Sequence, residues 1–363
     1  MAEQPKYMVV TRDESGNLYE FEKATNLQWE WYENEVGKCM FHLPHNDTKL
    51  TTTSIPQNAF SEIRIYRDGS LVWQGFITLL VEDKDGTTVY GLTYMECLKW
   101  YRVGFNTTYT TKKIGSEIIS PIYDIIVAYT NDIIGAKITK GTLQDPYTTG
   151  SSSVNKTITK TVFDEDFFSI LKDMVDASRA DSPSGSWKQD SVFDISFSDT
   201  APTFSFLRDV GSDKSDVVFE MDSEIVNFSF MTDVRTLFND SKGFAIQSGP
   251  TFFTSSQIDT TSRSTYYLRQ FSPYFGTVTS QAQLDEMTKD ILKKYKDPTQ
   301  TLAVEFAANI KPFDGYSMGD AVKVRIVRGR VNIDAFYRVV GMEVFIDDKG
   351  IETAKPLLQV KRS

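Results

Sequence analysis

Alternating apolar and polar residues mark the first hundred residues of the chain as antiparallel β structure. Residues 37–43 predict one strand with an apolar side chain at every second position. That apolar face consists of Cys39, Phe41 and Leu43. Residues 62–75 predict a hairpin, because Asp68-Gly69 suits the positive φ angles of a two-residue turn. A further strand, turn and strand follow over 76–94, and such closely spaced strands favour a small barrel or sandwich.

The middle of the chain carries helical patterns. Ser120-Pro121 predicts a helix start, because a capping residue precedes proline at the first helical position. The apolar face of this helix would consist of Ile122, Ile125, Ile126 and Tyr129. The polar stretch 139–161 predicts a loop or a weak hairpin.

A second helix is predicted to begin at Asp164 as its cap, with Phe163 and Phe168 forming a hydrophobic staple. This helix should end by residues 182–185, where serine, proline and glycine cluster. The pattern over this middle segment indicates an α/β domain between two β domains.

A third helix is predicted over residues 280–296. Ser280 and Gln283 form a capping-box pair, and Asp297-Pro298 stops the helix. Its apolar face consists of Leu284, Met287, Ile291, Leu292 and Tyr295.

The β pattern returns over residues 302–363, and it echoes the first. Residues 63–94 and 322–360 both run strand, glycine turn, strand, acidic turn closing on glycine, strand. The glycines are Gly69 and Gly86 in one copy and Gly329 and Gly350 in the other, 17 and 21 residues apart. Two unrelated β meanders can look equally alike, so the pattern leaves a true duplication open.

Composition narrows the class of protein. The 363 residues carry a formal charge of −10, which argues against a protein whose main task is to grip nucleic acid. No signal peptide pattern opens the chain, and no apolar run approaches the length of a membrane span. The only two cysteines, Cys39 and Cys97, suit buried thiols of a protein folded in a reducing cytoplasm.

Enzymatic motifs are scarce, and we expect no enzyme, no cofactor and no metal site. The only histidines, His42 and His45, are spaced to share a metal, but a strand places side chains three apart on opposite faces. The acidic candidates all fall at predicted caps or turns, where Asp is favoured for structural reasons. They are Asp164 with Asp166, Asp347 with Asp348, and the calcium-loop-like run Asp83-Lys84-Asp85-Gly86.

Two aromatic groups are candidates for stacking on sugars or bases, although core or interface packing is the more common role of such residues. The groups are Trp29, Trp31 and Tyr32, and Tyr266, Tyr267, Phe271 and Tyr274.

The order of the elements resembles that of the hub proteins of tailed phages. The phrase Ile63–Gly69 followed by Val72–Gly75 is similar to the first barrel of that family. Residues 233–244 resemble the start of its third domain. The family has a helix that leads into a Gly-Asp-x-Val strand, and this part resembles residues 280–298, Pro312-Phe313 and Tyr316–Val322. The closing hairpin of the family resembles residues 337–350. The resemblance is weakest at 105–215.

This resemblance implies an α+β, mainly β fold with two similar small β-barrel domains and α/β insertions between them. The first barrel would occupy 1–105, the α/β domain 106–214, the second barrel 215–235 with 300–363, and an inserted segment 236–299. Three copies would form a pseudo-sixfold ring that connects the tail tube to tip, spike or receptor-binding proteins. The ring would lie in the virion tail tip, be made in the host cytoplasm and let DNA pass without membrane insertion of its own.

Two other classes stay open at this point. One is a carbohydrate-binding or hydrolytic tail or cell-surface protein that uses the aromatic groups, and the other is an unrelated multidomain β-rich binding protein. For a hub, we expect a polar, acidic or neutral channel wall, because basic residues would retain DNA. Lys323, Arg325, Arg328 and Arg330 are clustered on one predicted hairpin, and this expectation would be wrong if they faced the channel.

Overall fold

The fold is mainly β. The computed structural model describes residues 6–12, 16–51, 54–55, 61–104, 106–130, 138–147, 155–179, 191–208, 210–246, 252–278, 280–307 and 315–360, of which 126–130, 179, 277 and 360 are described by their backbone alone. The chain divides into two compact units, Met1–Phe228 with Ala303–Ser363, and Ser229–Leu302. The predicted residues 182–185 and Pro312-Phe313 lie outside the described residues.

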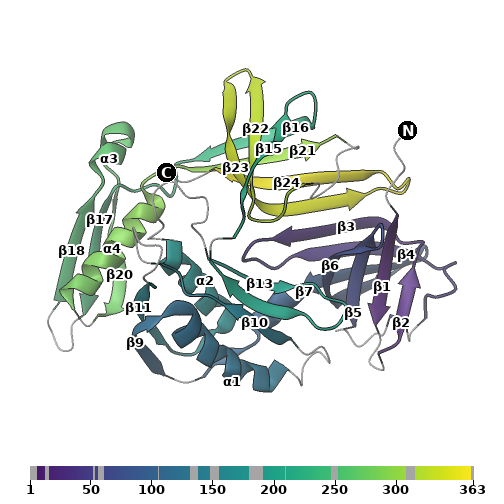
Figure 1. Cartoon of the computed structure of the whole chain (residues 1–363), viewed down its shortest axis with the longest axis horizontal. Helices are drawn as coiled ribbons and strands as arrows, with labels where there is room; N and C mark the ends of the chain where they lie inside the picture. Colours follow the sequence, from purple (N-terminus) through teal and green to yellow (C-terminus); the bar gives the residue numbers. More distant parts are fainter. Residues whose placement is uncertain are drawn as a thin grey trace. The chain divides into compact units, whose positions relative to one another are not determined.

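The first β region contains seven strands (Figure 1). These are β1 (Tyr7–Arg12), β2 (Leu18–Phe21), β3 (Thr25–Tyr32), β4 (Lys38–Pro44), β5 (Glu62–Arg67), β6 (Ser70–Glu82) and β7 (Gly86–Thr93). Their order in the sheet is β2-β1-β5-β6-β7-β4-β3. The predicted hairpin is confirmed, with Asp68 and Gly69 both at positive φ between β5 and β6. The predicted alternation of β4 is also confirmed, because Cys39, Phe41 and Leu43 are all buried.

The second β region contains six strands, from residues 213–233 and 299–360. These are β15 (Asp213–Glu220), β16 (Ile225–Asp233), β21 (Thr299–Phe306), β22 (Ala321–Arg328), β23 (Val331–Ile346) and β24 (Glu352–Val360). Their order is β15-β22-β23-β24-β21-β16. Val322, Val324 and Ile326 of β22 are fully buried, as their alternation predicts.

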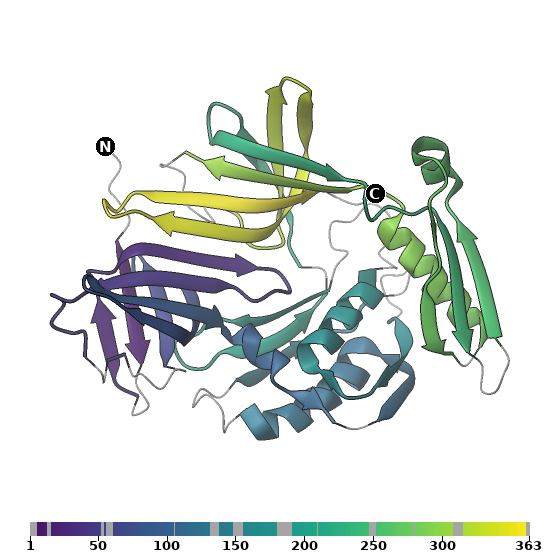
Figure 2. The same ribbon diagram turned by 180° about the vertical axis from the view of Figure 1, so that it is seen from behind.

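The predicted pair of separate barrels is wrong. The two β regions join edge to edge through β3 and β23 into one 13-stranded sheet, and the described strand pairings close neither region into a barrel. In Figure 2 the purple β3 and β4 run alongside the yellow β23 and β24. The sequence pattern predicts each meander. It does not predict which open strand edges pair with each other, because every edge has the same backbone donors and acceptors.

The repeated meander predicted from the glycine turns is present in both regions. β5, β6 and β7 pair antiparallel in sequence order, and β22, β23 and β24 do the same. In each copy the long middle strand changes register against the strand that follows, between Ile77 and Leu79 in β6 and between Val339 and Gly341 in β23. A shared irregularity at the same place supports a genuine internal repeat.

Between the β regions lies an α/β part with its own core. Its elements are a 3₁₀ helix (Tyr94–Lys99), β8 (Arg102–Val103), β9 (Thr107–Lys113), a π-helix (Ile114–Ile119), α1 (Ser120–Thr130), β10 (Thr139–Leu143), β11 (Thr157–Val162), β12 (Glu165–Asp166), α2 (Phe167–Arg179), β13 (Val192–Ser196) and β14 (Thr203–Leu207). The core includes Phe204, whose ring stacks on Tyr123 with centroids 5.0 Å apart.

The first helical segment begins earlier than predicted. A π-helical turn, Ile114–Ile119, runs directly into α1, so Ser120 is helical rather than a cap. Pro121 has no N–H to donate into the preceding turn, which favours the wider π turn there. Of the predicted apolar face, Ile122 is buried but Ile125 is 46% exposed, and the side chains of Ile126 and Tyr129 lie outside the described residues.

Two further predictions for this part are wrong. Asp166, not Asp164, caps α2, accepting from the Ser169 amide at 2.8 Å. Phe163 is 66% exposed, so it forms no staple. In the polar stretch 139–161, predicted as a loop or a weak hairpin, β10 pairs with β14 and β11 with β9. Between these two strands, Tyr147 and Asn155 form an isolated antiparallel bridge, as a weak hairpin would. Local capping rules cannot decide between two aspartates two residues apart, and long-range pairing overrides local turn signals.

The second unit packs one helix against a small sheet (Figure 1). Its elements are β17 (Asp240–Ile246), β18 (Phe252–Ile258), α3 (Thr260–Tyr266), β19 (Gln270–Phe271), β20 (Tyr274–Thr277) and α4 (Gln281–Tyr295). The predicted third helix is confirmed, with the Ser280 hydroxyl accepting from the Gln283 amide at 3.2 Å. Its buried face consists of Leu284, Thr288 and Leu292. None of the helices in the described ranges has the length and apolar character of a membrane span.

Candidate assembly interface

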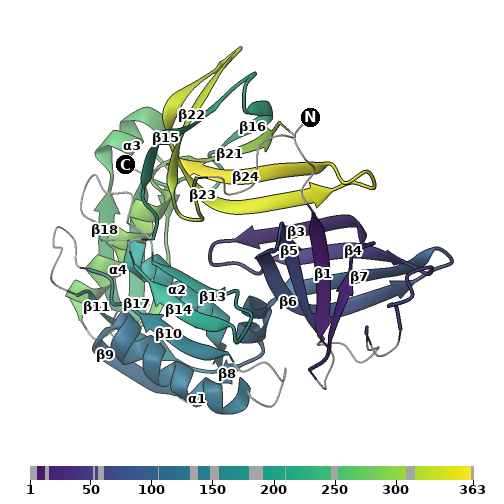
Figure 3. The same ribbon diagram turned by 45° about the vertical axis from the view of Figure 1, so that its right-hand side comes forward.

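The junction between β3 and β23 is an interface inside a single chain. Six residue pairs run antiparallel, from Gly341 opposite Tyr32 to Ile346 opposite Leu27. Figure 3 shows β3 next to the yellow strands of the second β region. A Cβ added at Gly341 would lie 2.5 Å from the Tyr32 ring, so the glycine allows this ring to cross the strand. The centre of the junction is buried, because Trp29 and Val344, which face each other, are both almost inaccessible to solvent.

Two buried ion pairs reinforce this junction. Arg338 of β23 binds the Glu33 carboxylate through both terminal nitrogens, and both side chains are less than a tenth exposed. Arg67 at the end of β5 binds Glu352 at the start of β24 at 2.7 and 3.0 Å. Bidentate guanidinium–carboxylate pairs fix geometry as well as charge. Each pair therefore joins one β region to the other in a defined register.

Tyr7 completes the second of these pairs. Its hydroxyl donates to Glu352, and burial together with the neighbouring carboxylate raises the pKa of Tyr7 well above its usual range. Tyr7 therefore stays protonated and continues to donate to Glu352 at any ordinary pH.

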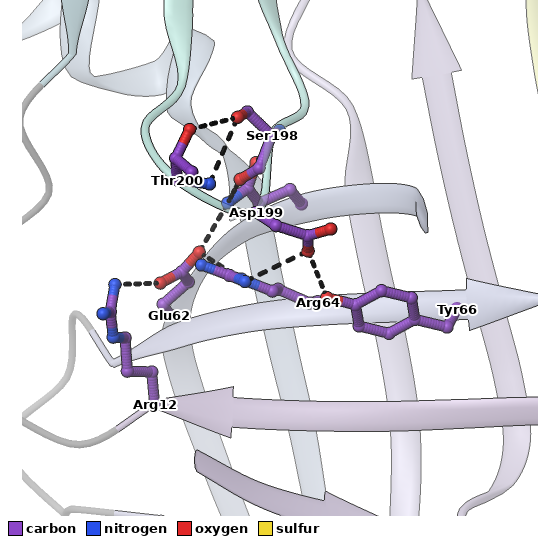
Figure 4. Close-up of polar contacts among 8 residues, drawn as sticks. Arg12, Glu62, Arg64, Tyr66, Ser198, Asp199 and Thr200 are labelled. Atoms are coloured by element: carbon purple, nitrogen blue, oxygen red, sulfur yellow. Dashed lines mark hydrogen bonds and ion pairs between the residues drawn. The ribbon is translucent and has the colours of Figure 1, made fainter. Parts of the chain in front are cut away.

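A polar cluster ties the hairpin between β13 and β14 to the first β region (Figure 4). Buried Arg64 binds Glu62 at 2.7 Å and reaches Asp199 of that hairpin at 3.2 Å. Arg12 binds Glu62 from the other side, and Gln74 exchanges hydrogen bonds with the Ser198 backbone. Every charge in this cluster has an opposite partner, so we interpret it as a clamp that positions the α/β part.

Asp194 on β13 lies beside the same contact between the α/β part and β3. Its carboxylate accepts a hydrogen bond from the Trp31 indole, and burial raises the pKa of Asp194 to about 6. In the unfolded chain an aspartate titrates near pH 3.9. Between these values the folded protein binds more protons than the unfolded chain, so the free energy of unfolding falls as pH rises from about 4 to about 6.

We expect Asp194→Asn to remove this decline and to raise the free energy of unfolding at pH 7 by about 1–3 kcal/mol. Asparagine keeps the acceptor for Trp31 but carries no charge to desolvate. Urea unfolding at several pH values from 4 to 7 measures the effect. Asp348→Asn, in an exposed turn, is the control and should keep the wild-type slope. An unchanged slope in Asp194→Asn would contradict the prediction.

Open edges with apolar side chains lie away from the internal junction. On the last part of β6, Thr78–Glu82, one edge pairs with β7 and the other has no partner among the described strands. Leu79 and Val81 there are 54% and 43% exposed. β16 ends the sheet on the other side, and its Val226 is 54% exposed. Exposed apolar side chains on an open strand edge are typical of a surface that pairs with another chain.

No local sequence pattern marks Arg338, Glu33, Arg67 or Glu352 as interface residues. The length of β23 does point to an interface. At 16 residues this strand is too long to pair along its whole length with a single neighbouring strand. Its first half pairs with β22, and its last part pairs with β24 and β3 on opposite edges.

The two histidines take separate structural roles. The His42 ring bonds the Thr88 hydroxyl at 3.2 Å, and the His45 ring bonds the Asp83 carbonyl at 2.8 Å. Among the residues with described positions, no three His, Cys, Asp or Glu side chains gather in a way that could hold a metal ion. Cys39 and Cys97 are buried free thiols, as predicted.

The acidic candidates are turn and cap residues. Asp83 accepts from the amides of Asp85 and Gly86, which lowers the pKa of Asp83. Asp347 accepts from the amides of Lys349 and Ile351 in the same manner, beside the exposed Asp348. Asp164 pairs with Arg102 on the surface, while Asp166 caps α2. The structure does not bring these residues together.

The two aromatic groups differ in exposure. Trp29 is buried, Trp31 packs on Phe197, and the Tyr32 hydroxyl donates to Glu343. In the second unit, Tyr267, Tyr274 and Phe271 are 84%, 62% and 43% exposed. The N-terminal group therefore belongs to the internal junction. In the second group Tyr266 is half-buried and the Phe271 ring stacks on Phe238, so Tyr267 and Tyr274 are its most exposed members.

Three residues of the basic cluster are paired with acids of the same chain. Lys323 and Arg325 both contact Asp334, at 3.0 and 3.4 Å, and Arg328 contacts Asp222 at 2.6 Å. Arg330 is exposed at the turn. These ion pairs reduce the positive charge on the surface of the β22–β23 hairpin.

Neither a protein-family model nor a curated protein matches the chain. Solved structures match over nearly its whole length. The 43 kDa tail protein of prophage MuSo2 from Shewanella oneidensis is 11% identical, with a TM-score of 0.64 over 97% of this chain and 98% of that one. A tail protein from Neisseria meningitidis is also 11% identical, with a TM-score of 0.64 over 98% and 97%.

A third similar structure is the E. coli c3393 protein, a component of the type VI secretion system with structural similarity to T4 tail proteins gp27 and gp5. It is 8% identical, with a TM-score of 0.52 over 93% of this chain and 74% of that one. The chain therefore has the fold of phage tail proteins, as the order of its elements indicated.

Proposed function

We propose that this protein is the structural hub of a phage tail tip or baseplate. Three copies form a ring with pseudo-sixfold symmetry, which connects the tail tube to the distal host-recognition apparatus and lines the DNA channel. The observation that carries the proposal is the repeated β meander joined in one sheet, in a chain with the fold of phage tail proteins. Two similar β regions in each of three copies provide six similar positions around one axis.

The proposed partners follow from this position. Tail-tube or distal tail proteins bind above the ring, and tip, spike or receptor-binding proteins bind below it. DNA is present only in transit, and the protein has no enzymatic role. Its place is the virion tail tip, after synthesis in the host cytoplasm.

The channel wall is proposed to be acidic or neutral. The net charge of −10 supports this, and so do the ion pairs of Lys323 and Arg325 with Asp334 and of Arg328 with Asp222. A wall without free cations lets a duplex slide, because each unpaired Lys or Arg would add a phosphate contact.

We expect the purified protein to form a closed trimer, with a mass near three times 41.2 kDa, at high concentration or with its tail partners present. A closed ring satisfies open strand edges without further growth. Light scattering over a range of concentrations measures the mass. A mass near 41.2 kDa under all these conditions would count against the hub.

A second candidate function is carbohydrate binding, favoured by the exposed Tyr267 and Tyr274. Pull-down of the protein on host cell-wall polysaccharide separates the two. Binding that is lost in Tyr267→Ala, by a protein that stays monomeric, would favour this alternative.

A further inference from the structure

We propose that copies of this chain join by adding β16 of one copy to the open edge of β6 in the next, which reproduces between chains the β3–β23 junction found within one. The inference rests on the proposed ring and names the surface that forms it. It follows from a strand-by-strand correspondence between the two β regions.

The middle and outer strands correspond through the sheet order. Starting from the middle strand of each meander, the first region runs β6-β7-β4-β3 and the second runs β23-β24-β21-β16. β16 therefore occupies the position of β3. The register shifts in β6 and β23 place Leu79 where Gly341 lies, so the open edge of β6 corresponds to the edge of β23 that receives β3.

The hairpin turns give the same correspondence between strands. In the first region Arg67 pairs with Ser70 across a two-residue turn, and in the second Arg328 pairs with Val331 across another. Arg328 is therefore the counterpart of Arg67, whose guanidinium binds Glu352 across the internal junction.

The counterpart contact cannot form within one sheet, because six strands separate β16 from β6 in the sheet order. It requires a second copy. The edges are suited to it, since Leu79, Val81 and Val226 are exposed, whereas Leu27 and Val344 of the internal junction are buried. Pairing of the open edges would bury this apolar surface and satisfy backbone groups.

A second contact between copies would join the β22–β23 turn, which carries Arg328, to the acidic turn beside the β6 edge. The turn between β6 and β7 exposes Glu82, Asp83 and Asp85, with Lys84 as the one opposing charge in that turn. Arg328 would meet this turn on the neighbouring copy, as Arg67 meets Glu352. Its present partner is Asp222, in a pair that is more than half exposed on both sides and therefore exchanges at little cost.

Each copy would offer β16 to one neighbour and receive β16 of the other at β6. Such a contact is heterologous, and it closes when the rotation between copies completes a circle. The same contact would then occur three times between chains and the β3–β23 junction three times within chains, which gives the sixfold arrangement its two alternating interfaces.

Thiol cross-linking of the full chain tests the inference. Both native cysteines are buried, so a Val226→Cys/Leu79→Cys variant presents the new thiols for a short bismaleimide. Head-to-tail links then run as covalent trimer on a denaturing gel, whereas links within one chain run as monomer. The matched control is Val226→Cys/Leu18→Cys, because Leu18 on β2 is as exposed as Leu79, at 54%.

We expect on the order of tenfold more covalent trimer from the Val226/Leu79 variant than from the control, since paired strands hold the thiols at high effective concentration. We also expect Arg328→Glu to weaken assembly about tenfold and Glu82→Arg in the same chain to restore it, because like charges at an interface repel.

If light scattering shows trimers but Val226→Cys and Leu79→Cys do not cross-link, the β16–β6 interface is wrong and the proposed hub function still stands. Equal cross-linking in the control would overturn it too. Absence of both link and trimer would overturn it together with the proposed ring.

Discussion

Replacing Phe204 with alanine is expected to lower the free energy of unfolding by about 3–5 kcal/mol. Phe204 is fully buried in the core of the α/β part, where its ring stacks on Tyr123 and lies 5.7 Å from Phe167. Truncation removes apolar contacts and leaves a cavity that β14, held between β10 and β13, cannot collapse to fill. Thermal or urea unfolding followed by near-UV circular dichroism measures the change.

Phe163→Ala is the matched control for Phe204→Ala. It deletes the same side chain from a position that is 66% exposed, so we expect a change of less than about 0.5 kcal/mol. A large loss here would mean that Phe163 contributes to packing after all and would revive the staple predicted from sequence.

Replacing Glu33 with alanine is expected to cost about 3–5 kcal/mol, because the Arg338 guanidinium would be left buried without its counter-charge. The hydrogen bond from Arg338 to the Gly319 carbonyl, at 3.2 Å, cannot replace a carboxylate. We expect the same variant to weaken the β3–β23 junction, which hydrogen exchange of the β3 amides would report.

A double variant distinguishes the cost of losing the ion pair from the cost of leaving one buried charge without its partner. Glu33→Leu with Arg338→Met removes both charges at similar volume, so we expect it to be clearly more stable than Glu33→Ala alone. Glu22→Ala, which removes an exposed partner of Lys6, should change stability by less than about 1 kcal/mol. If the double variant were as unstable as Glu33→Ala, packing rather than charge would explain the loss.

The sequence by itself determined the local elements and their repeat. Alternation in β4 and β22, the Asp68-Gly69 turn and the cap and stop of α4 each depend on neighbours in the chain, so local pattern suffices for them. The glycine-to-glycine echo likewise predicted the meander that both β regions contain. The prediction that His42, His45 and the aspartates have structural roles likewise rests on local properties, namely strand parity and turn preference.

Only the tertiary structure decided how the two meanders meet. Open strand edges have the same backbone donors and acceptors everywhere, so no residue pattern names β23 as the partner of β3. The pairs Glu33–Arg338 and Arg67–Glu352 join residues roughly 300 positions apart, and each residue alone reads as an ordinary surface charge. The single sheet, the junction within it and the edges left open for another copy are consequences of that long-range pairing.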